Sequence, residues 1–388
     1  NRMSAETRTP CHGAGFPPRF DRSRGNDFVS GAREMIISRT PYRISLFGGG
    51  TDYPAWYRQH GGTVLSVTIN KYCYLTCRYL PPFFEHRFRV VYSRIEDCRS
   101  VGEIAHPAVR SILQFLKFER GLEIHHDGDL PGRSGMGSSS AFTVGLLNAL
   151  YVLRGETPDK PRLARESIHV EQELLKETVG SQDQVCAAYG GLNLIQFHRD
   201  GEVEVQPVNL PEERLSELQE HLMLFYTGIK RTASDIAATY VNGIDAKEAQ
   251  LKTMSRFVSE ALAILREGGG MDAFGRLLHR SWESKRSLSD RVSNARVDQF
   301  YAKAIAAGAL GGKLLGAGGG GFLLMFVPPD RRVAVRAALS DLIHVPFEFE
   351  FSGSQIIFAD HEEDFEEQEK LRDQQPIAAF RELSGGSS

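Results

Sequence analysis

The chain has 388 residues, with 46 Lys or Arg against 49 Asp or Glu and a formal net charge of −3. This balance excludes a protein that holds nucleic acid by bulk charge, because binding to a phosphate backbone needs a clear basic excess. No apolar run approaches the roughly 18 residues of a membrane span, and the five cysteines include no CxxC pair. We expect a soluble, cytoplasmic protein of two domains, with neither nucleic acid nor a membrane as partner.

The two ends of the chain differ in composition from the middle. Residues 1–34 are rich in Arg, Gly, Pro and Ser, which predicts a disordered leader. Residues 361–388 begin with an acidic run and end in Gly-Gly-Ser-Ser, which is typical of a solvated helix and a frayed tail. Between them we expect a first lobe at 35–205 and a second lobe at 206–360.

Segments rich in Val, Ile, Tyr and Phe alternate with segments of helical periodicity along both lobes. In the first lobe the pattern predicts strands at 35–47, 63–80, 87–93, 121–127 and 190–197, and helices at 106–120, 138–153 and 161–178. The proline-containing stretch 203–210 is interpreted as the crossing between the lobes. In the second lobe the same pattern predicts strands at 222–226, 322–327 and 347–357, and helices at 246–267, 271–287, 296–307 and 331–342. The predicted fold class is α+β.

A glycine- and serine-rich segment separates the predicted strand 121–127 from the predicted helix 138–153. It reads Leu130-Pro-Gly-Arg-Ser-Gly-Met-Gly-Ser-Ser-Ser-Ala141, and residues 130–140 are called the first glycine loop below. Glycines let the backbone approach an anion, and a helix N-terminus presents unpaired N–H groups. Serine hydroxyls there can contact phosphate or magnesium. From the residues alone, a flexible loop with serine caps on a core helix is an equally good interpretation.

Two further glycine clusters stand next to predicted strands. In Pro41-Tyr-Arg-Ile-Ser-Leu-Phe-Gly-Gly-Gly-Thr-Asp-Tyr53, Arg43 and Asp52 flank a glycine turn, an arrangement that suits recognition of a polar ligand. A surface ion pair beside a tight turn is the commoner case for such a pair. In Gly311-Gly-Lys-Leu-Leu-Gly-Ala-Gly-Gly-Gly-Gly-Phe322, the run of four glycines indicates close packing against backbone or ligand. Residues 316–321 are called the second glycine loop.

Two acidic residues of the first lobe are further candidates. Glu171 falls within the apolar stripe of the predicted helix 161–178, and an acid in that position usually has a partner, such as a metal ion. Asp183 lies in the polar run Gly180-Ser-Gln-Asp-Gln184, which precedes an apolar stretch. Its local sequence favours an acid at the cap or in the first turn of a helix.

Taken together and in this order, these segments resemble the sugar kinases of the galactokinase, homoserine, mevalonate and phosphomevalonate (GHMP) kinase superfamily. The resemblance runs from about residue 35 to residue 360, and Ser45–Pro54 and Gly180–Val185 look most like the bacterial D-glycero-D-manno-heptose 7-phosphate kinases. It implies a two-lobed fold, in which a first lobe like domain 2 of ribosomal protein S5 is joined to a ferredoxin-like second lobe. It also implies ATP and Mg²⁺ as cofactors.

The resemblance assigns roles to single residues. Asp183 matches the acid that orients or deprotonates the sugar hydroxyl, Arg43 the cation that steadies the transferred phosphoryl group, and Asp52 an acceptor for a sugar hydroxyl. Ser139 and Glu171 match the positions that hold magnesium. The ATP phosphates are expected at Arg133, Ser134, Gly135, Met136, Gly137, Ser138, Ser139 and Ser140. Support of that loop is expected from Gly316, Ala317, Gly318, Gly319 and Gly320.

One departure from the galactokinase pattern concerns the substrate. Gly49 and Gly50 stand where galactokinases carry Glu and His against the C6 end of the sugar. The glycines open space for a heptose 7-phosphate, whose phosphate would need a cation, with Lys230, Arg231, Lys285 and Arg286 as candidates. The expected reaction is ATP-dependent phosphorylation of the anomeric hydroxyl of that sugar phosphate, in the synthesis of nucleotide-activated heptose. A fucokinase- or galactokinase-like sugar 1-kinase, or a non-catalytic ATP-binding sugar sensor, are the alternatives.

Overall fold

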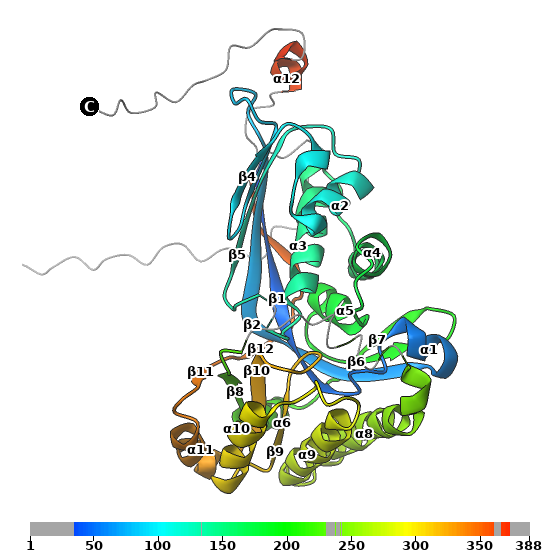
Figure 1. Ribbon diagram of the computed structural model, residues 1–388, viewed down its shortest axis with the longest axis vertical. Helices are drawn as coiled ribbons and strands as arrows, with labels where there is room; N and C mark the ends of the chain where they lie inside the picture. Colours follow the sequence, from blue (N-terminus) through cyan, green and yellow to red (C-terminus); the bar gives the residue numbers. More distant parts are fainter. Residues whose placement is uncertain are drawn as a thin grey trace, which may run out of the picture. The chain divides into compact units, whose positions relative to one another are not determined.

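A computed structural model describes residues 35–132, 134–229, 237, 241, 243–360 and 366–372. The predicted leader and most of the predicted tail lie outside these residues. Within them the chain mixes helices with two β-sheets, as expected of the α+β class (Figure 1). No helix of this part of the chain is long and apolar enough to cross a membrane.

The larger sheet belongs to the first lobe and has nine strands among the described residues. Its strands are β1 (Met35–Phe47), β2 (Gly62–Tyr79), β3 (Phe88–Val91), β4 (Ile95–Cys98), β5 (Leu122–Gly128), β6 (Leu192–Phe197), β7 (Val203–Pro207), β12 (Phe349–Glu350) and β13 (Gln355–Asp360). The main order is β13-β1-β2-β5-β3-β4, while β12 and β6 pair with β2, and β7 pairs with β6. All pairs are antiparallel except β3 with β5.

Helices cover one face of this sheet (Figure 1). They are α2 (Pro107–Phe115), α3 (Ser138–Leu153), α4 (Lys160–His169) and α5 (Gln182–Tyr189), and the short α1 (Pro54–His60) follows the glycine turn. Helix α3 packs on β1 and β2 and is buried along most of its length. The first glycine loop therefore ends on a rigid core helix, which fixes its position against β1.

The smaller sheet belongs to the second lobe and is ordered β11-β8-β10-β9. Its strands are β8 (Leu222–Tyr226), β9 (Gly311–Leu314), β10 (Phe322–Phe326) and β11 (Ile343–Val345). The accompanying helices are α6 (Glu212–His221), α8 (Glu248–Glu267), α9 (Asp272–Arg286), α10 (Ala295–Ala306) and α11 (Arg332–Ala338). Helix α9 packs on β9 and α8, and both α8 and α9 also contact β1.

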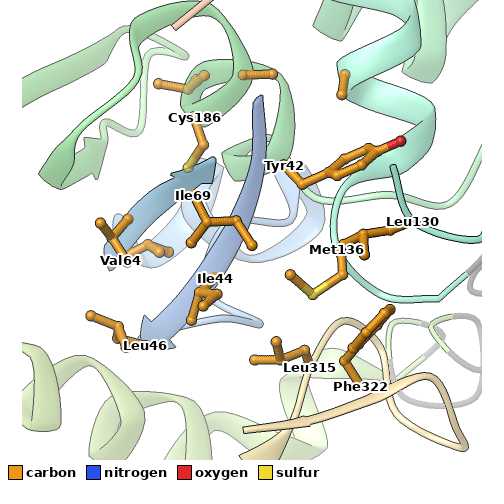
Figure 2. Packing of buried hydrophobic residues seen from close by; sticks show 14 of the residues in the cluster. Tyr42, Ile44, Leu46, Val64, Ile69, Leu130, Met136, Cys186, Leu315 and Phe322 are labelled. Atoms are coloured by element: carbon orange, nitrogen blue, oxygen red, sulfur yellow. The ribbon is translucent and has the colours of Figure 1, made fainter. Parts of the chain in front are cut away.

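A continuous apolar core links the two sheets. Figure 2 shows side chains from β1, the first glycine loop and the segment around the second glycine loop packed together. They include Tyr42, Ile44, Leu46, Leu130, Met136, Leu315 and Phe322, all of which are buried. Because Met136 and Leu315 belong to the same cluster, burial of apolar surface holds both glycine loops against the end of β1.

The structure corrects several sequence expectations. The stretch 203–210 is not a bare crossing, because Val203–Pro207 forms β7 on the edge of the first sheet. The predicted helix 161–178 ends at His169 and continues as a π-helical turn, Val170–Leu174. The predicted strand 347–357 divides into β12 and β13, which pair in the first sheet although they follow the second in sequence.

Part of the predicted solvated tail is docked on the first lobe. It contains α12 (Glu366–Arg372), in which Glu369 is buried. The carboxylate of Glu369 accepts a hydrogen bond of 2.9 Å from the backbone N–H of Gly121 and lies 3.4 Å from the guanidinium of Arg120. This helix is therefore not wholly solvated.

Candidate active site

One cleft brings together the segments that the sequence singled out. It has a volume of about 230 Å³ and lies between β1, the two glycine loops, the loop before α5 and the end of α9. The lining includes Arg43, Ser45, Gly49, Gly50, Asp52, Gly135, Gly137, Ser138, Ser139, Ser140, Gln182, Asp183, Lys285, Leu288, Gly316 and Ala317. Residues as far apart in the chain as Arg43 and Ala317 thus line one cleft.

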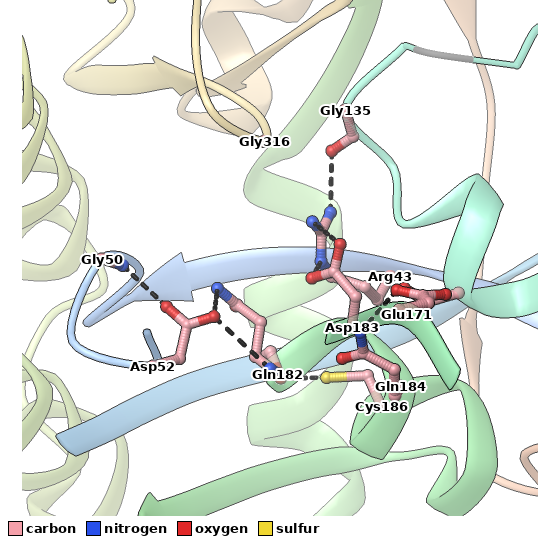
Figure 3. Close-up of polar contacts among 12 residues, drawn as sticks. Arg43, Gly50, Asp52, Gly135, Glu171, Gln182, Asp183, Gln184, Cys186 and Gly316 are labelled. Atoms are coloured by element: carbon pink, nitrogen blue, oxygen red, sulfur yellow. Dashed lines mark hydrogen bonds and ion pairs between the residues drawn. The ribbon is translucent and has the colours of Figure 1, made fainter. Parts of the chain in front are cut away.

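Arg43 and Asp183 form a two-pronged ion pair in this cleft (Figure 3). Nε and one terminal nitrogen of Arg43 each donate a hydrogen bond of 2.7 Å to a separate oxygen of Asp183. The other terminal nitrogen donates to the carbonyl of Gly135, also at 2.7 Å. Asp183 stands in the first turn of α5, as its local sequence predicts, where the helix dipole favours an acid. Arg43 therefore ties α5 to the first glycine loop.

Asp52 is 1 % exposed and lines the cleft beside the glycine turn. Its Oδ1 accepts a hydrogen bond of 2.8 Å from the backbone N–H of Gly50, and its Oδ2 accepts one of 2.9 Å from the amide of Gln182. Burial raises its pKa, whereas the hydrogen bond from Gly50 acts in the opposite direction. Gly180 closes the niche, because a β-carbon there would lie only 1.9 Å from Oδ2 of Asp52.

Glu171 lies on the π-helical turn and is 1 % exposed. Its Oε2 accepts hydrogen bonds from the hydroxyl of Ser140 at 2.9 Å and from the amide of Gln184 at 2.6 Å. Its Oε1 is buried without a partner. Burial raises the pKa of Glu171 to about 8, so a nearby cation would be needed to stabilise its ionised form at neutral pH.

These donors fit a magnesium ion. The orphaned oxygen of Glu171 and the serine hydroxyls that open α3 are hard oxygen ligands, the kind that Mg²⁺ prefers. The described residues contain no cluster of three or more His, Cys, Asp or Glu that could hold a metal. A single carboxylate still suits magnesium, which commonly takes its remaining ligands from substrate phosphates and water.

The second glycine loop packs backbone on backbone, one of the two options that the residues left open. A β-carbon at Gly321, which has φ +97°, would lie 2.0 Å from the carbonyl oxygen of Ser134 in the first glycine loop. Gly318 and Gly320 approach the backbone of Val292 and Ile229 in the same way. The second glycine loop thus meets the first at Gly321, where no side chain fits, while Gly318 and Gly320 pack on residues of the second lobe.

The structure brings most of the predicted site residues together, with a few exceptions. Arg133, Arg231 and Lys230 lie outside the described residues. Ser139 is exposed in the cleft, and Ser140, not Ser139, contacts Glu171. Lys285 lines the cleft and donates a hydrogen bond of 3.2 Å to the carbonyl of Leu314. The other candidate for the sugar phosphate, Arg286, is not among the cleft residues and pairs with Glu283 and Asp298.

Sequence reasoning missed three buried polar residues. Gln182 and Gln184 flank Asp183 and hold the two other acids of the site. Lys313 on β9 is 3 % exposed and donates a hydrogen bond of 3.0 Å to the carbonyl of Leu46. The available signal for the glutamines was their place on either side of the predicted acid in the polar run Gly180-Ser-Gln-Asp-Gln184. Nothing in the local sequence distinguishes Lys313 from a surface lysine.

Two family models match the chain, one on each side of the cleft. The model described as GHMP kinases N terminal domain matches residues 103–191. The model described as GHMP kinases C terminal matches residues 252–344. The first covers the first glycine loop, Glu171 and Asp183, and the second covers the second glycine loop and Lys285.

Curated relatives from bacteria and archaea are similar over most of the chain. A D-glycero-alpha-D-manno-heptose 7-phosphate kinase of Campylobacter jejuni is 30% identical over 79% of this chain and 93% of its own length. An L-fucokinase/L-fucose-1-P guanylyltransferase of Bacteroides fragilis is 28% identical over 78% of this chain and 35% of its own length. A galactokinase of Pyrococcus furiosus is 24% identical over 78% of this chain and 92% of its own length.

Solved structures share the fold. A D-glycero-D-manno-heptose 1-phosphate kinase from Bacteroides thetaiotaomicron superposes with a TM-score of 0.67 at 24% identity, over 82% of this chain and 98% of that one. A putative sugar kinase from Campylobacter jejuni superposes with a TM-score of 0.63 at 27% identity, over 85% of this chain and 100% of that one. The two-lobed arrangement expected from the sequence is therefore the fold of this chain.

Proposed function

The chain belongs to the GHMP kinase family and is a sugar kinase, and we propose that it transfers the γ-phosphoryl group of ATP to the anomeric hydroxyl of D-glycero-D-manno-heptose 7-phosphate. The observation that carries the proposal is the Arg43–Asp183 pair, which stands between the first glycine loop and the niche of Asp52 in one cleft. Its product would be the 1,7-bisphosphate, an intermediate toward nucleotide-activated heptose. We place the reaction in the cytoplasm.

The cleft residues would divide the work of phosphoryl transfer, which depends on positioning and charge neutralisation. The N–H groups that open α3 would hold the ATP phosphates. Asp183 would accept the proton of the anomeric hydroxyl. At the same time the hydroxyl oxygen would bond to the γ-phosphorus, and the bond between the γ-phosphorus and the leaving oxygen of ADP would break. Arg43 would steady the transferred phosphoryl group beside that acid. Magnesium, held by Glu171 and a serine hydroxyl of 138–140, would neutralise phosphate charge when bound.

The heptose phosphate is favoured by two observations. The relative from Campylobacter jejuni, which carries that substrate in its name, is similar over nearly its whole length. In this chain Gly49 and Gly50 both line the cleft, so these two positions add no side chain to it. Lys285 lines the same cleft and is our candidate, among the residues that the structure describes, for binding the phosphate group of the sugar. Arg231, which lies outside those residues, is the other candidate.

A second candidate substrate, a 6-deoxy sugar such as L-fucose, is favoured by one contact. A β-carbon at Gly50 would lie 3.3 Å from Cδ2 of Leu251 and 3.9 Å from the Cε methyl of Met254 on α8. Apolar neighbours suit a methyl group at the C6 end better than a phosphate, whose burial needs charged or polar partners. The relative from Bacteroides fragilis is named as an L-fucokinase.

The test is coupled release of ADP from Mg·ATP with heptose 7-phosphate, L-fucose and galactose offered in parallel. Turnover on the heptose phosphate alone, lost in Asp183→Asn, is the expected result. Turnover on L-fucose alone would keep the kinase chemistry and replace the substrate. If none of the three sugars is phosphorylated while ATP still binds, the heptose phosphate proposal is wrong, and an untested sugar comes before the sugar-sensor alternative.

A further inference from the structure

Three consecutive residues in the first turn of α5 contact three charged side chains that come from three other places in the fold. Gln182 holds Asp52 beside the glycine turn, Asp183 holds Arg43 on β1, and Gln184 holds Glu171 on the π-helical turn (Figure 3). Arg43 belongs to the proposed phosphoryl-transfer chemistry. The two glutamines have no role in it so far.

The contact of Gln182 with Asp52 fixes that carboxylate on one side. The side-chain amide and the backbone N–H of Gln182 both donate to Oδ2, at 2.9 and 3.4 Å, and leave Oδ1 to the N–H of Gly50. The backbone N–H of Ser181 also donates to the carbonyl of Asp52, at 2.9 Å. With Gly180 closing the niche, this short segment determines where the Asp52 carboxylate lies.

The contact of Gln184 fixes Glu171 in a different way. Its amide and the hydroxyl of Ser140 approach the same oxygen, Oε2, from α5 and α3 respectively. Both side chains are buried, Gln184 at 0 % and Ser140 at 2 % exposure. The hydroxyl of Ser140 and the amide of Gln184 both meet at Oε2, whereas Oε1 has no hydrogen-bond partner. The orientation of the carboxylate is therefore set with one oxygen still available to a ligand.

The neutrality of the two amides matters as much as their position. A lysine or arginine in either place would satisfy the carboxylate and also neutralise its charge. A glutamine N–H donates a hydrogen bond without adding a charge, so Asp52 and Glu171 keep their full capacity to attract a hydroxyl proton or a cation.

We propose that Gln182 and Gln184 are positioning residues that separately orient Asp52 for the sugar and Glu171 for magnesium, with Asp183 between them. The proposal rests on the proposed function, because it takes from it the roles of Asp52 and Glu171. In this proposal the first turn of α5 determines where the sugar site at Asp52 and the magnesium site at Glu171 lie relative to the base, Asp183.

The experiment uses Gln182→Met and Gln184→Met, which keep the length of the side chain and remove its donor. Two constants are measured for each: the KM of the sugar that the wild type phosphorylates, heptose 7-phosphate or L-fucose, and the Mg²⁺ concentration needed for half-maximal binding of a non-hydrolysable ATP analogue by calorimetry. We expect Gln182→Met to raise the sugar KM at least tenfold and leave the Mg²⁺ requirement unchanged. Gln184→Met should raise the Mg²⁺ requirement at least fivefold and leave the sugar KM unchanged.

A matched control separates positioning from stability. Asn148 on α3 is also buried and donates a hydrogen bond of 3.0 Å to Ser354, and its side chain is not among the cleft residues. Asn148→Leu should lower the melting temperature as the Met variants do, without changing either constant. If the Met variants only lower the melting temperature, or shift both constants together, the proposal is wrong. Should either fail to fold, Gln182→Asn and Gln184→Asn are required to show the same split.

Two further variants distinguish failure of this proposal from failure of the proposed function. Asp52→Asn should raise the sugar KM, and Glu171→Gln should raise the Mg²⁺ requirement. If these acid variants behave as expected but the glutamine variants do not, the positioning roles are overturned and the proposed function stands. If Asp52→Asn leaves the sugar KM unchanged, the sugar site itself is wrongly assigned, and the role given to Gln182 falls with it.

Discussion

The guanidinium of Arg43 and the carboxylate of Asp183 meet in two parallel hydrogen bonds, each of 2.7 Å. Arg43 is 4 % exposed and Asp183 25 %, so the cation is enclosed while the acid still faces the cleft. Such two-pronged pairs fix geometry as well as charge. The proposed base therefore has one orientation before any ligand arrives, which is what a proton acceptor in phosphoryl transfer requires.

The first prediction concerns this pair. Asp183→Asn keeps the shape of the side chain but removes the charge and most of the basicity, so kcat should fall by about 10²–10⁴-fold, the usual contribution of a general base. Binding of the ATP analogue should stay within about twofold, because Asp183 is not expected to contact the nucleotide. Steady-state kinetics and calorimetry measure the two effects. A kcat within a factor of ten of the wild type would remove Asp183 from the role of base.

The second prediction concerns Gly180. A β-carbon at this position would collide with Asp52, so Gly180→Ala should displace that carboxylate and raise the sugar KM by about tenfold or more. Gly269→Ala is the matched control, because a β-carbon there meets nothing within 4 Å. It should leave the sugar KM unchanged. An unchanged sugar KM in Gly180→Ala would show that Asp52 does not contact the sugar.

The sequence predicts this fold best where a segment's own residues determine its structure. The bounds of β1, α3 and β8 are predicted to the residue, because β-branched and aromatic runs or a glycine–serine start mark them locally. The burial of Glu171 and the place of Asp183 in a first turn are also local properties, and both are confirmed.

Other features depend on contacts between distant residues. The strand at 203–207 forms because β6 offers it an edge to pair with, and its one proline, Pro207, stands at the end of this edge strand, where it is tolerated. Ser140 rather than Ser139 faces Glu171 because of the turn that enters α3, and no residue pattern specifies that choice. The contacts of Gln182 and Gln184 follow from the fold, which brings Asp52 from the glycine turn and Glu171 from the π-helical turn beside them.

The third prediction concerns the contact between the glycine loops. Gly321→Ala combines a positive φ of 97° with a clash against the carbonyl of Ser134, so it should displace the first glycine loop and raise the KM of ATP. Gly243→Ala separates the two effects, because Gly243 has φ +115° but no atom within 4 Å of its β-carbon position. It should cost about 1 kcal/mol of stability with no kinetic change. Equal behaviour of the two variants would show that strain alone, not the loop contact, matters.

The fourth prediction concerns Lys313, whose ammonium is buried under the cleft. Burial, reinforced by the charge of Arg43, lowers its pKa from 10.5 to about 7. Between these values the unfolded chain binds a proton that the folded protein does not, so Lys313 makes the free energy of unfolding rise with pH. Below pH 7 both states are protonated, and the cost of burying the charge is then constant, at as much as about 5 kcal/mol.

Lys313→Met should abolish this dependence. Guanidinium unfolding of both proteins from pH 6 to pH 9.5 gives the difference in unfolding free energy, wild type minus variant. We expect the difference to be flat below about pH 7 and to rise by up to about 1.4 kcal/mol per pH unit above it, since one proton is linked to unfolding. The lost hydrogen bond to the carbonyl of Leu46 adds an offset that does not change with pH. A difference that stays flat to pH 9.5 would mean that the buried ammonium keeps its proton, held by Asp52 more strongly than burial disfavours it.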